Sequence, residues 1–290
     1  MRRVGSPTVR KGNSAKLALP NGRASDTLAA MKITATIITL NEADDIREAC
    51  ESVAWADEIL IIDSGSTDHT RQIAEECGAR VITNPWPGFS KQKQFAVDAA
   101  SHDWIFSLDA DERISAELRA SIDQVRGQDE SQLAGGYRLA RRAFYMNRWI
   151  RGGGWYPDYQ LRLFNRQRGR WGDRVIHESV VMNEGVRVET LRGDLLHYSM
   201  RDPSHHRQMI EERYAPLGAE QMYRDGKRTS RIQQAVAGPA AFIRSFILKG
   251  GFRDGSAGLV IAKLAAHHAA LKHSILLKLQ KETELRNREQ

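Results

Sequence analysis

The stretch ITATIITLNEADDIREACESVAWADEILIID, residues 33–63, decides the fold. Residues 34–40 form an apolar run rich in β-branched side chains, which predicts a buried strand. Residues 43–54 place apolar side chains at helical spacing behind acidic residues, which predicts a helix. Residues 58–62 are a second apolar run. Strand, short helix and strand in this order favour two parallel strands joined by a helix.

The same alternation continues along the chain. It predicts a helix over residues 66–77, a strand over 80–83, a helix over 90–100 and a strand over 104–108. Continuous apolar strands separated by helices are typical of a sheet that is covered on both faces. The fold class is therefore α/β with a mostly parallel central sheet covered by helices, and ligands of such sheets bind at the carboxyl ends of the strands.

Three predicted strands end in acidic or amide side chains. The first leads into Asn41 and Glu42, the second into residues 63–68 and the fourth into residues 109–112. Within residues 63–68, Thr67 or Asp68 is expected to cap the following helix. Clustered carboxylates repel one another unless a cation or a ligand with many donors lies among them. We therefore expect a ligand site at this edge of the sheet.

The pair Asp109-x-Asp111 has the chemistry of a divalent metal site. Mg²⁺ and Mn²⁺ prefer carboxylate oxygens and usually share their coordination shell with substrate phosphates. The pair follows the apolar run WIFSL and two earlier polar strand ends. Because of that context, we interpret it as a metal or nucleotide site rather than a chance occurrence.

Net charge divides the chain into three parts. The 290 residues carry +7 overall, but residues 1–32 carry +6, residues 33–200 carry −6 and residues 201–290 carry +7. Residues 1–31 lack apolar periodicity and are predicted to form a disordered basic leader. Every apolar run is broken by charge well short of about 18 residues, so no membrane-spanning segment is expected. The two cysteines, Cys50 and Cys77, favour a reducing compartment and small buried roles.

Residues 201–290 are predicted to be a basic, amphipathic helical region, with helices over about 204–222, 231–248 and 258–281. Basic amphipathic helices of this kind suggest docking on an anionic membrane surface. The alternative is a helical subdomain that packs on the catalytic sheet and exposes its basic face to solvent. The apolar side chains behind these readings are Phe242, Phe246 and Leu248 in one helix and Leu264, Leu271, Ile275 and Leu279 in another.

Several segments together resemble family 2 glycosyltransferases with the GT-A fold. They are ATIITLNEADDI (35–46), EILIIDSGSTDHT (58–70), GFSKQKQFAVDAA (88–100) and DWIFSLDADE (103–112). The later segments GGWYPDYQLRLF (153–164), RVIHES (174–179) and LLHYS (195–199) resemble the branch containing the lipopolysaccharide core β-glucosyltransferases. The resemblance covers roughly residues 32–279. It implies a catalytic domain over 32–200, with a nucleotide-sugar half (32–115) and an acceptor half (116–200).

The resemblance also implies roles for individual residues on the donor side. Asn41 and Glu42 would line the nucleoside pocket and Asp63 would bind the base. Asp109 would lie near the ribose or the metal, and Asp111 would hold Mg²⁺ or Mn²⁺ against the diphosphate. Lys91 or Lys93 could meet a phosphate, or lie on a solvated helical face. Arg162 could bind the diphosphate or form an ion pair with the acidic edge of the sheet. His197, near the end of the predicted catalytic domain, could be a metal ligand or a structural residue.

An inverting displacement needs a base that removes the proton of the acceptor hydroxyl. Glu178 is the first candidate, because it matches the acidic residue of the family's catalytic motif, and Asp158 is the second. His177 could assist Glu178 or bind metal. Trp155 and Tyr156 could form a stacking platform for the acceptor beside the glycine run 152–154, or both could be core residues.

The resulting hypothesis is a cytoplasmic enzyme on the inner-membrane surface that transfers glucose from UDP-glucose to the lipopolysaccharide inner core or a related glycolipid. A polyprenyl phosphate or a protein is the alternative acceptor. The hypothesis from another class is a nucleic-acid-binding protein that uses the basic flanks. It is disfavoured because the sequence has no interleaved aromatic and basic motif and its acidic strand ends would repel phosphate.

Overall fold

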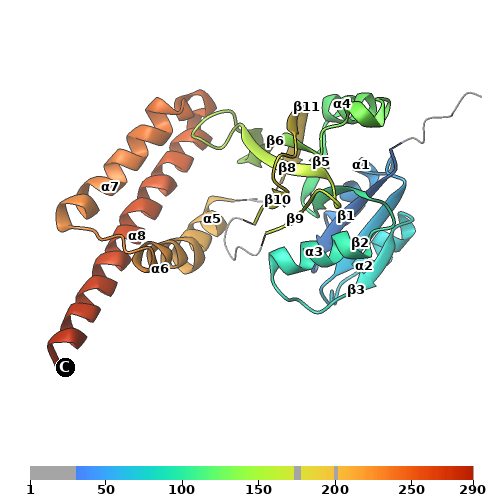
Figure 1. Ribbon diagram of the computed structural model, residues 1–290. Helices are drawn as coiled ribbons and strands as arrows, with labels where there is room; N and C mark the ends of the chain where they lie inside the picture. Colours follow the sequence, from blue (N-terminus) through green and yellow to red (C-terminus); the bar gives the residue numbers. More distant parts are fainter. Residues whose placement is uncertain (1–30, 173–177, 199–201, 290) are drawn as a thin grey trace, which may run out of the picture. The chain divides into compact units, whose positions relative to one another are not determined.

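The computed structural model describes residues 31–172, 178–198 and 202–289 (Figure 1). The predicted leader falls almost wholly outside these ranges, as does His177. Residues from Met31 onward form one compact unit. The first strands and helices follow the predicted alternation, and helices make up most of the chain after residue 202.

The central sheet has nine strands in the order β3-β2-β1-β4-β8-β6-β11-β5, with β7 paired to β6. Parallel pairing joins β3 to β2, β2 to β1, β1 to β4 and β6 to β11, while β8 and β5 pair antiparallel with their neighbours. A separate two-stranded sheet consists of β9 and β10. The strands are β1 Ile33–Thr39, β2 Glu58–Asp63, β3 Arg80–Thr83, β4 Trp104–Asp109, β5 Glu112–Ile114, β6 Gly136–Tyr145, β7 Arg148–Trp149, β8 Asp158–Asn165, β9 Gly169–Trp171, β10 Val180–Met182 and β11 Val188–His197.

The register of the parallel strands brings their acidic ends to one level. Thr39 at the end of β1 pairs with Asp63 on β2, and Ile38 pairs with Asp109 on β4. The side chains that follow these strands therefore meet at one edge of the sheet, as the sequence predicts.

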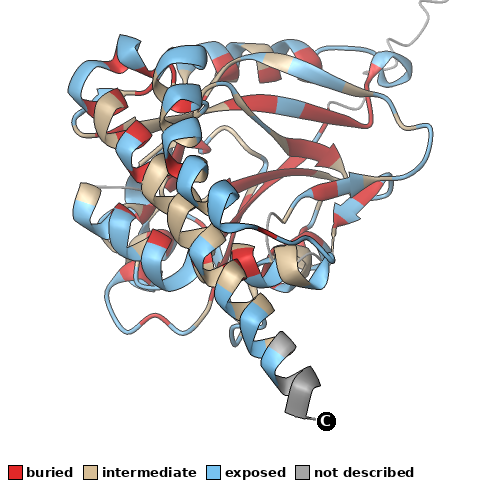
Figure 2. Cartoon of the chain, turned by 90° about the vertical axis from the view of Figure 1, so that its left-hand side faces the viewer, coloured by how far each residue is buried: buried red, intermediate tan, exposed pale blue. Residues whose placement is uncertain are grey.

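Successive residues of a strand point to opposite faces of the sheet. Because β1 and β2 are buried along almost their whole length, both faces are covered by a core. Ile33 and Ile37 of β1 join one core with helices α1 and α4, and Leu60 and Ile62 of β2 join another with α3. Figure 2 shows buried residues along the strands and exposed residues on many helical turns. These helices are α1 Ile46–Ser52, α2 Thr70–Glu76, α3 Phe89–Ala99 and α4 Ala116–Arg126, followed by the 3₁₀ turn η1 Glu130–Gln132.

Helices α1 and α2 begin later than the sequence predicts, at Ile46 and Thr70 rather than at residues 43 and 66. The residues before them form two loops that bind each other. The Asn41 backbone N–H donates to Oγ of Ser66 at 2.9 Å, and Oδ1 of Asn41 accepts from the Thr67 backbone N–H at 2.9 Å. These bonds satisfy backbone groups outside the helices.

The expected cap at Thr67 or Asp68 is wrong, because the residue directly before α2 is His69, whose side chain makes no cap hydrogen bond. Asp68 instead supports the first residue of the helix. Oδ1 of Asp68 accepts from the Thr70 backbone N–H at 3.0 Å. The Thr70 hydroxyl in turn accepts from the Glu42 backbone N–H at 2.8 Å. The acidic loop after β2 thus helps to hold the loop after β1.

The C-terminal region is helical, as predicted. Ser230 and Gln233 form a capping box at the start of α7, and Asp202 caps α5. No helix in the described part of the chain is long and apolar enough to cross a bilayer. The elements are α5 Pro203–Met209, the π-helical turn η2 Ile210–Tyr214, α6 Ala215–Arg224, α7 Arg231–Ile243, the π-helical turn η3 Arg244–Leu248, the 3₁₀ turn η4 Gly251–Asp254 and α8 Gly255–Glu289.

The apolar stripe of α8 packs within this helical region. Leu264 is buried with Ile210 and Ala215, and Leu271 and Ile275 pack against the same cluster. This stripe thus packs against η2 and α6 of the same helical region. Leu248 in η3, by contrast, is 75% exposed.

Candidate active site

A cavity of about 830 Å³ lies at the carboxyl ends of β1 and β4. Residues from positions 38 to 197 line it, together with residues of α5 and η2. Seven of the site residues expected from the sequence are among them: Glu42, Asp109, Asp111, Trp155, Asp158, Glu178 and His197. The other lining residues are Ile38, Thr39, Leu40, Trp86, Phe89, Ala110, Arg141, Ala143, Gly154, His205, Met209 and Tyr214.

Asn41 and Asp63 are not among the residues that line the cavity, and both form hydrogen bonds within the loops at this edge. Asp63 is fully buried, and its carboxylate accepts from the backbone N–H groups of Gly65 and Ser66 and from the Ser66 hydroxyl. Gly65 has φ +102°, a left-handed conformation that favours glycine. Asp63 thus fixes the tight turn after β2. Ser66 of this turn accepts the Asn41 backbone N–H and so positions Asn41.

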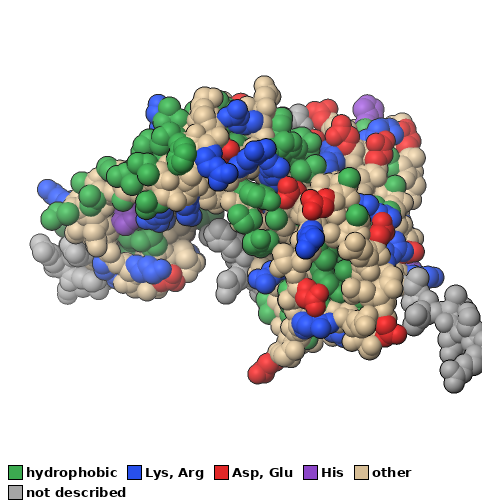
Figure 3. Space-filling model, turned by 90° about the horizontal axis from the view of Figure 1, so that it is seen from above, with side chains coloured by type: hydrophobic (Ala, Val, Ile, Leu, Met, Phe, Trp, Pro, Cys, Tyr) green, Lys and Arg blue, Asp and Glu red, His purple; other side chains and the backbone are tan. Residues whose placement is uncertain are grey.

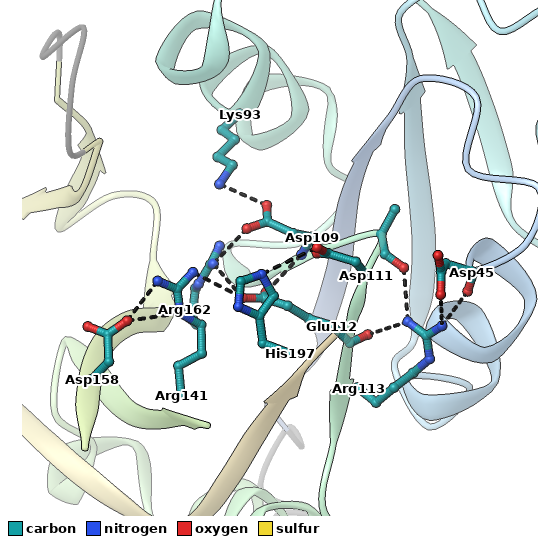
Figure 4. A network of polar contacts seen from close by, with 11 residues as sticks. Asp45, Lys93, Asp109, Asp111, Glu112, Arg113, Arg141, Asp158, Arg162 and His197 are labelled. Atoms are coloured by element: carbon teal, nitrogen blue, oxygen red, sulfur yellow. Dashed lines mark hydrogen bonds and ion pairs between the residues drawn. The ribbon is translucent and has the colours of Figure 1, made fainter. Parts of the chain in front are cut away.

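Asp109 lies between two cations (Figure 4). Its Oδ1 is 2.8 Å from Nζ of Lys93 on α3, and its Oδ2 is 2.8 Å from Nη2 of Arg162 on β8. Burial opposes ionisation of Asp109, but the charges of Arg162 and Lys93 outweigh it and hold the pKa well below its usual range. Lys93 and Arg162 are both buried, so neither lies on a solvated face. For Arg162, the alternative of an ion pair with the acidic edge is the arrangement observed.

Arg162 also reaches Glu112, a fully buried carboxylate in β5. Its Nη2 is 2.9 Å from Oε1 of Glu112, and Oε2 of Glu112 accepts from the Asp109 backbone N–H at 3.0 Å. The neighbouring carboxylates of Asp109 and Glu112 raise the pKa of Arg162 despite its burial. Nε and Nη1 of Arg162 are buried donors that have no hydrogen-bond partner in the described structure.

Arg141 on β6 extends this network to Asp158. Its Nε and Nη2 donate to Oδ2 of Asp158 at 2.9 and 2.7 Å, and its Nη1 is 3.6 Å from Oε1 of Glu112. Lys93 extends the other end, with Nζ 3.9 Å from Oε1 of Glu178. The two candidate bases therefore lie at opposite ends of one chain of alternating charges.

Asp111 and His197 form the pair that best fits a metal ion. Nε2 of His197 is 3.3 Å from Oδ2 of Asp111, and both residues line the cavity. Over the described ranges, no group of three or more His, Cys, Asp or Glu side chains is arranged to hold a metal. Two protein ligands still suit Mg²⁺ or Mn²⁺, because these ions take their remaining ligands from phosphates and water.

The turn that carries Asp109 and Asp111 is fixed by a residue that the sequence analysis did not identify. Arg113 is buried, and its guanidinium donates to the carbonyl oxygen of Ala110 at 2.9 Å and to that of Asp45 at 2.7 Å. It thus joins the turn after β4 to the loop after β1. Its place two residues after Asp111 is the only hint in the sequence.

Trp155 and Tyr156 do not form one platform. Trp155 lines the active-site cavity and packs against Tyr145 and His206, with ring centroids 5.3 and 5.4 Å away. Tyr156 faces a different cavity, and its hydroxyl donates to Oδ1 of Asp194 at 2.9 Å. A stacking role therefore remains open for Trp155 alone in this cavity.

The glycine run 152–154 lies against the chain's own C-terminal region. A Cβ on Gly152 would lie 2.4 Å from the carbonyl oxygen of Gly250, and one on Gly154 would lie 2.6 Å from Cδ of Lys249. These glycines permit a close approach by another part of the same chain. The approaching group in the structure is the segment before η4.

Aromatic and apolar side chains at the mouth of the cavity were also missed. Trp86 and Phe89 contact each other edge to face at 4.7 Å, and they are 45% and 37% exposed. Tyr214 and Met209 line the same cavity. Exposed aromatic rings beside a polar cavity are typical of ligand sites. The segment NPWPGF (84–89), in which two prolines flank Trp86, gives only a weak signal in the sequence.

The two cysteines take no part in this site. Cys50 is 1% exposed, and burial raises its thiol pKa to about 12. Cys77 is partly exposed, and both thiols are free. The expectation of a buried side chain is confirmed for Cys50 and is wrong for Cys77.

The fold and the cavity define an α/β protein that binds a polar ligand at the ends of its parallel strands. A family model described as Glycosyl transferase family 2 matches residues 34–191. The chain is 32% identical over 253 residues to the lipopolysaccharide core biosynthesis glycosyltransferase LpsC of Rhizobium meliloti (strain 1021), covering 83% of this chain and 90% of that protein. It is 32% identical over 260 residues to an uncharacterized glycosyltransferase of Rickettsia bellii (strain RML369-C), covering 86% and 87%.

The chain therefore belongs to glycosyl transferase family 2, and it is a nucleotide-sugar-dependent glycosyltransferase. Among solved structures, it is similar to S. aureus TarS 1-349, with 14% identity and a TM-score of 0.43 over 89% of this chain and 92% of that chain. It is also similar to glucosyl-3-phosphoglycerate synthase from Mycobacterium tuberculosis in complex with Mn²⁺, uridine diphosphate and glucosyl-3-phosphoglycerate. There the identity is 23% and the TM-score 0.33, over 43% of this chain and 50% of that chain. The predicted family and GT-A fold class are confirmed.

Proposed function

We propose that the protein is an inverting glycosyltransferase that transfers glucose from UDP-glucose to the inner core of lipopolysaccharide or a related glycolipid. The observation that carries the proposal is that Asp109, Asp111, Asp158 and Glu178 line the same cavity. The name of LpsC, a lipopolysaccharide core biosynthesis glycosyltransferase, supports the choice of acceptor. The choice of UDP-glucose rests on the resemblance of the later sequence segments to core β-glucosyltransferases.

On the donor side, the loops of Asn41, Glu42 and Asp63 would hold the nucleoside. Asp63 would act mainly by fixing the turn at Gly65, because its oxygens already accept bonds from that turn. Arg162 and Lys93 lower the pKa of Asp109 and so favour its carboxylate form, which can accept hydrogen bonds from ribose hydroxyls. Lys93 and Arg162 keep it in place.

Asp111 and His197 would hold Mg²⁺ or Mn²⁺, with Asp109 close by but engaged by its two cations. When bound, such an ion neutralises negative charge on the leaving diphosphate. Arg113 keeps the Asp111 turn attached to the loop after β1, which preserves the position of this carboxylate.

Glu178 would accept the proton from the acceptor hydroxyl. Within the described residues, its carboxylate forms an ion pair with Lys93 at 3.9 Å, while Asp158 receives two hydrogen bonds from Arg141 and one from Gln160. A carboxylate that is already bound by donors is a weaker proton acceptor. Asp158 with Arg141 would instead orient the sugar or the acceptor.

The acceptor would approach past Trp155 from a membrane surface on the cytoplasmic side of the inner membrane. A polyprenyl phosphate or a protein acceptor is the alternative, with the same donor chemistry. Basic residues after position 200 and a lipid-linked acceptor support the membrane surface.

The test is a purified-enzyme assay of several UDP-sugars against core-truncated lipopolysaccharides, a polyprenyl phosphate and a protein extract. We expect transfer from UDP-glucose to one truncated core, with a β-linkage in the product by nuclear magnetic resonance. An α-linkage would exclude the inverting mechanism. Transfer only to polyprenyl phosphate or protein would replace the proposed acceptor.

A further inference from the structure

A second cavity, of about 820 Å³, lies on the other side of the segment that contains Trp155 and Tyr156. Gly154 and Trp155 line the active-site cavity, whereas Tyr156 and Pro157 line the second one. A four-residue segment thus borders both cavities. The residues lining the second cavity are Arg142, Arg151, Tyr156, Pro157, Ile247, Leu248, Lys249, Gly250, Phe252 and Arg253.

The lining of this cavity is cationic. It includes three arginines and one lysine, and none of the described residues that line it is acidic. Two carboxylates that contact lining residues already have partners. Asp254 is buried and accepts from the backbone N–H groups of Arg151 and Gly152 at 3.0 and 2.7 Å. Asp194 accepts from the Tyr156 hydroxyl and lies 3.4 Å from Nη1 of Arg142.

Arg142 is the most enclosed of the four cations. Its side chain is 19% exposed and lies over the ring of Tyr156, with 5.6 Å between the guanidinium carbon and the ring centroid. Its buried Nε has no partner in the described structure. The cavity therefore combines surplus positive charge with an unused donor, which suits a phosphate group.

The rim of the cavity is apolar and exposed. Ile247, Leu248 and Phe252 are 55%, 75% and 57% exposed, and all three line the cavity. Figure 3 shows hydrophobic side chains over the helical part of the molecule with Lys and Arg side chains beside them. A free phosphate or a nucleic-acid backbone gives no reason for an apolar rim. Cations beside exposed apolar side chains match a lipid surface, whose head groups are charged and whose interior is apolar.

We propose that this second cavity binds the phosphate-bearing head group of a membrane lipid. Arg142, Arg151, Lys249 and Arg253 meet the phosphate, while Ile247, Leu248 and Phe252 enter the apolar part of the bilayer. The inference rests on the proposed function for its lipid-linked acceptor. A lipid bound here lies beside the segment 154–157, which also borders the active-site cavity.

The test is co-sedimentation of the full chain with vesicles of phosphatidylcholine, with and without phosphatidylglycerol. We expect binding only to the anionic vesicles. Replacing Arg151 and Arg253 together by Glu should weaken the binding at least about tenfold, because each cation near an anionic surface contributes to attraction. The matched control is Arg71→Glu, an exposed residue on α2, which should bind nearly as the wild type does.

A second variant isolates the apolar rim. Leu248→Ser combined with Phe252→Ser leaves the charge unchanged and should also weaken binding about tenfold. All four substituted residues are exposed, so melting temperatures and UDP binding by calorimetry should stay at wild-type values. These readings separate lipid binding from folding and from the donor site.

Unchanged vesicle binding in the double Glu variant would overturn the proposal. Equal binding of inorganic phosphate or of an RNA homopolymer, with no effect of the two serines, would also overturn it in favour of a general anion site. Intact vesicle binding without any sugar transfer would leave this inference standing and count against the proposed function.

Discussion

The guanidinium of Arg141 lies between two carboxylates, with Nη2 2.7 Å from Oδ2 of Asp158 and Nη1 3.6 Å from Oε1 of Glu112. Glu112 is fully buried, and it also binds Arg162, which in turn holds Asp109. One side chain thus connects the acceptor side of the cavity to the carboxylate at the end of β4. We therefore expect its position to influence the binding of both substrates.

Replacing Arg141 by Gln should lower kcat/KM by about 10²-fold, because small displacements of positioning groups are costly in catalysis. The effect should fall on kcat more than on UDP binding. The matched control is Arg187→Gln, an exposed arginine paired with Glu189 at 3.3 Å. If both variants lost activity equally, the Arg141 network would have no special role.

The two candidate bases can be separated by isosteric amides. Glu178→Gln should lower kcat by about 10²- to 10⁴-fold, because a general base contributes that much. Asp158→Asn keeps a polar group beside Arg141 and should have a smaller effect on kcat and a larger one on KM. Steady-state kinetics with UDP-glucose measure both constants. The opposite pattern would make Asp158 the base.

Metal binding should depend on the Asp111–His197 pair. Asp111→Ala should abolish turnover, and it should weaken Mn²⁺ binding in the presence of UDP, which electron paramagnetic resonance can measure. His197→Gln should weaken that binding by about tenfold or more. Wild-type turnover that persists in excess chelator would contradict a catalytic role for the metal.

Stability should fall as the pH drops from about 6.5 towards 4. Burial, together with the charges of His268 and His205, lowers the pKa of His206 to about 4. The unfolded chain binds a proton at His206 near pH 6.5, whereas the folded chain resists it until about pH 4, so protons favour unfolding in this window. His268 shifts in the same direction.

Thermal melts of the wild type and of His206→Phe measure this effect. The variant should lose less stability than the wild type between pH 6.5 and 4, because residue 206 no longer titrates. An unchanged pH slope would show that His206 does not contribute.

Gly152→Ala should destabilise the chain by about 1–3 kcal/mol, the usual cost of forcing extra volume into a packed site. The added Cβ would meet the carbonyl oxygen of Gly250 at 2.4 Å. Gly185→Ala is a comparison without such a clash, since nothing lies within 4 Å of its added Cβ, although its positive φ carries a backbone cost of its own. Urea denaturation gives the free energies of unfolding. Equal losses would rule out a tight contact at Gly152.

Much of the fold followed from the sequence because its apolar runs have clear periods. The strand at residues 80–83 was predicted with its exact ends, and the other three early strands were predicted to within one residue. The helix starts at residues 43 and 66 were wrong, because Asn41, Ser66 and Thr67 bind one another across two loops. Local propensity contains no information about such a long-range pairing.

The sequence by itself determined the α/β class, the acidic strand ends and the family, because each depends on residue types in a fixed order. Only the tertiary structure decided which charges meet. Arg141, Glu112 and Arg162 are far apart along the chain and become one network through the pairing of β6 with β8 and of β11 with β5. It likewise placed Trp155 and Tyr156, which are neighbours in sequence, on two different cavities. Those two residues lie in the loop before β8. For the charge network, the physical reason is that strand alternation and sheet register, rather than sequence distance, set where a side chain points.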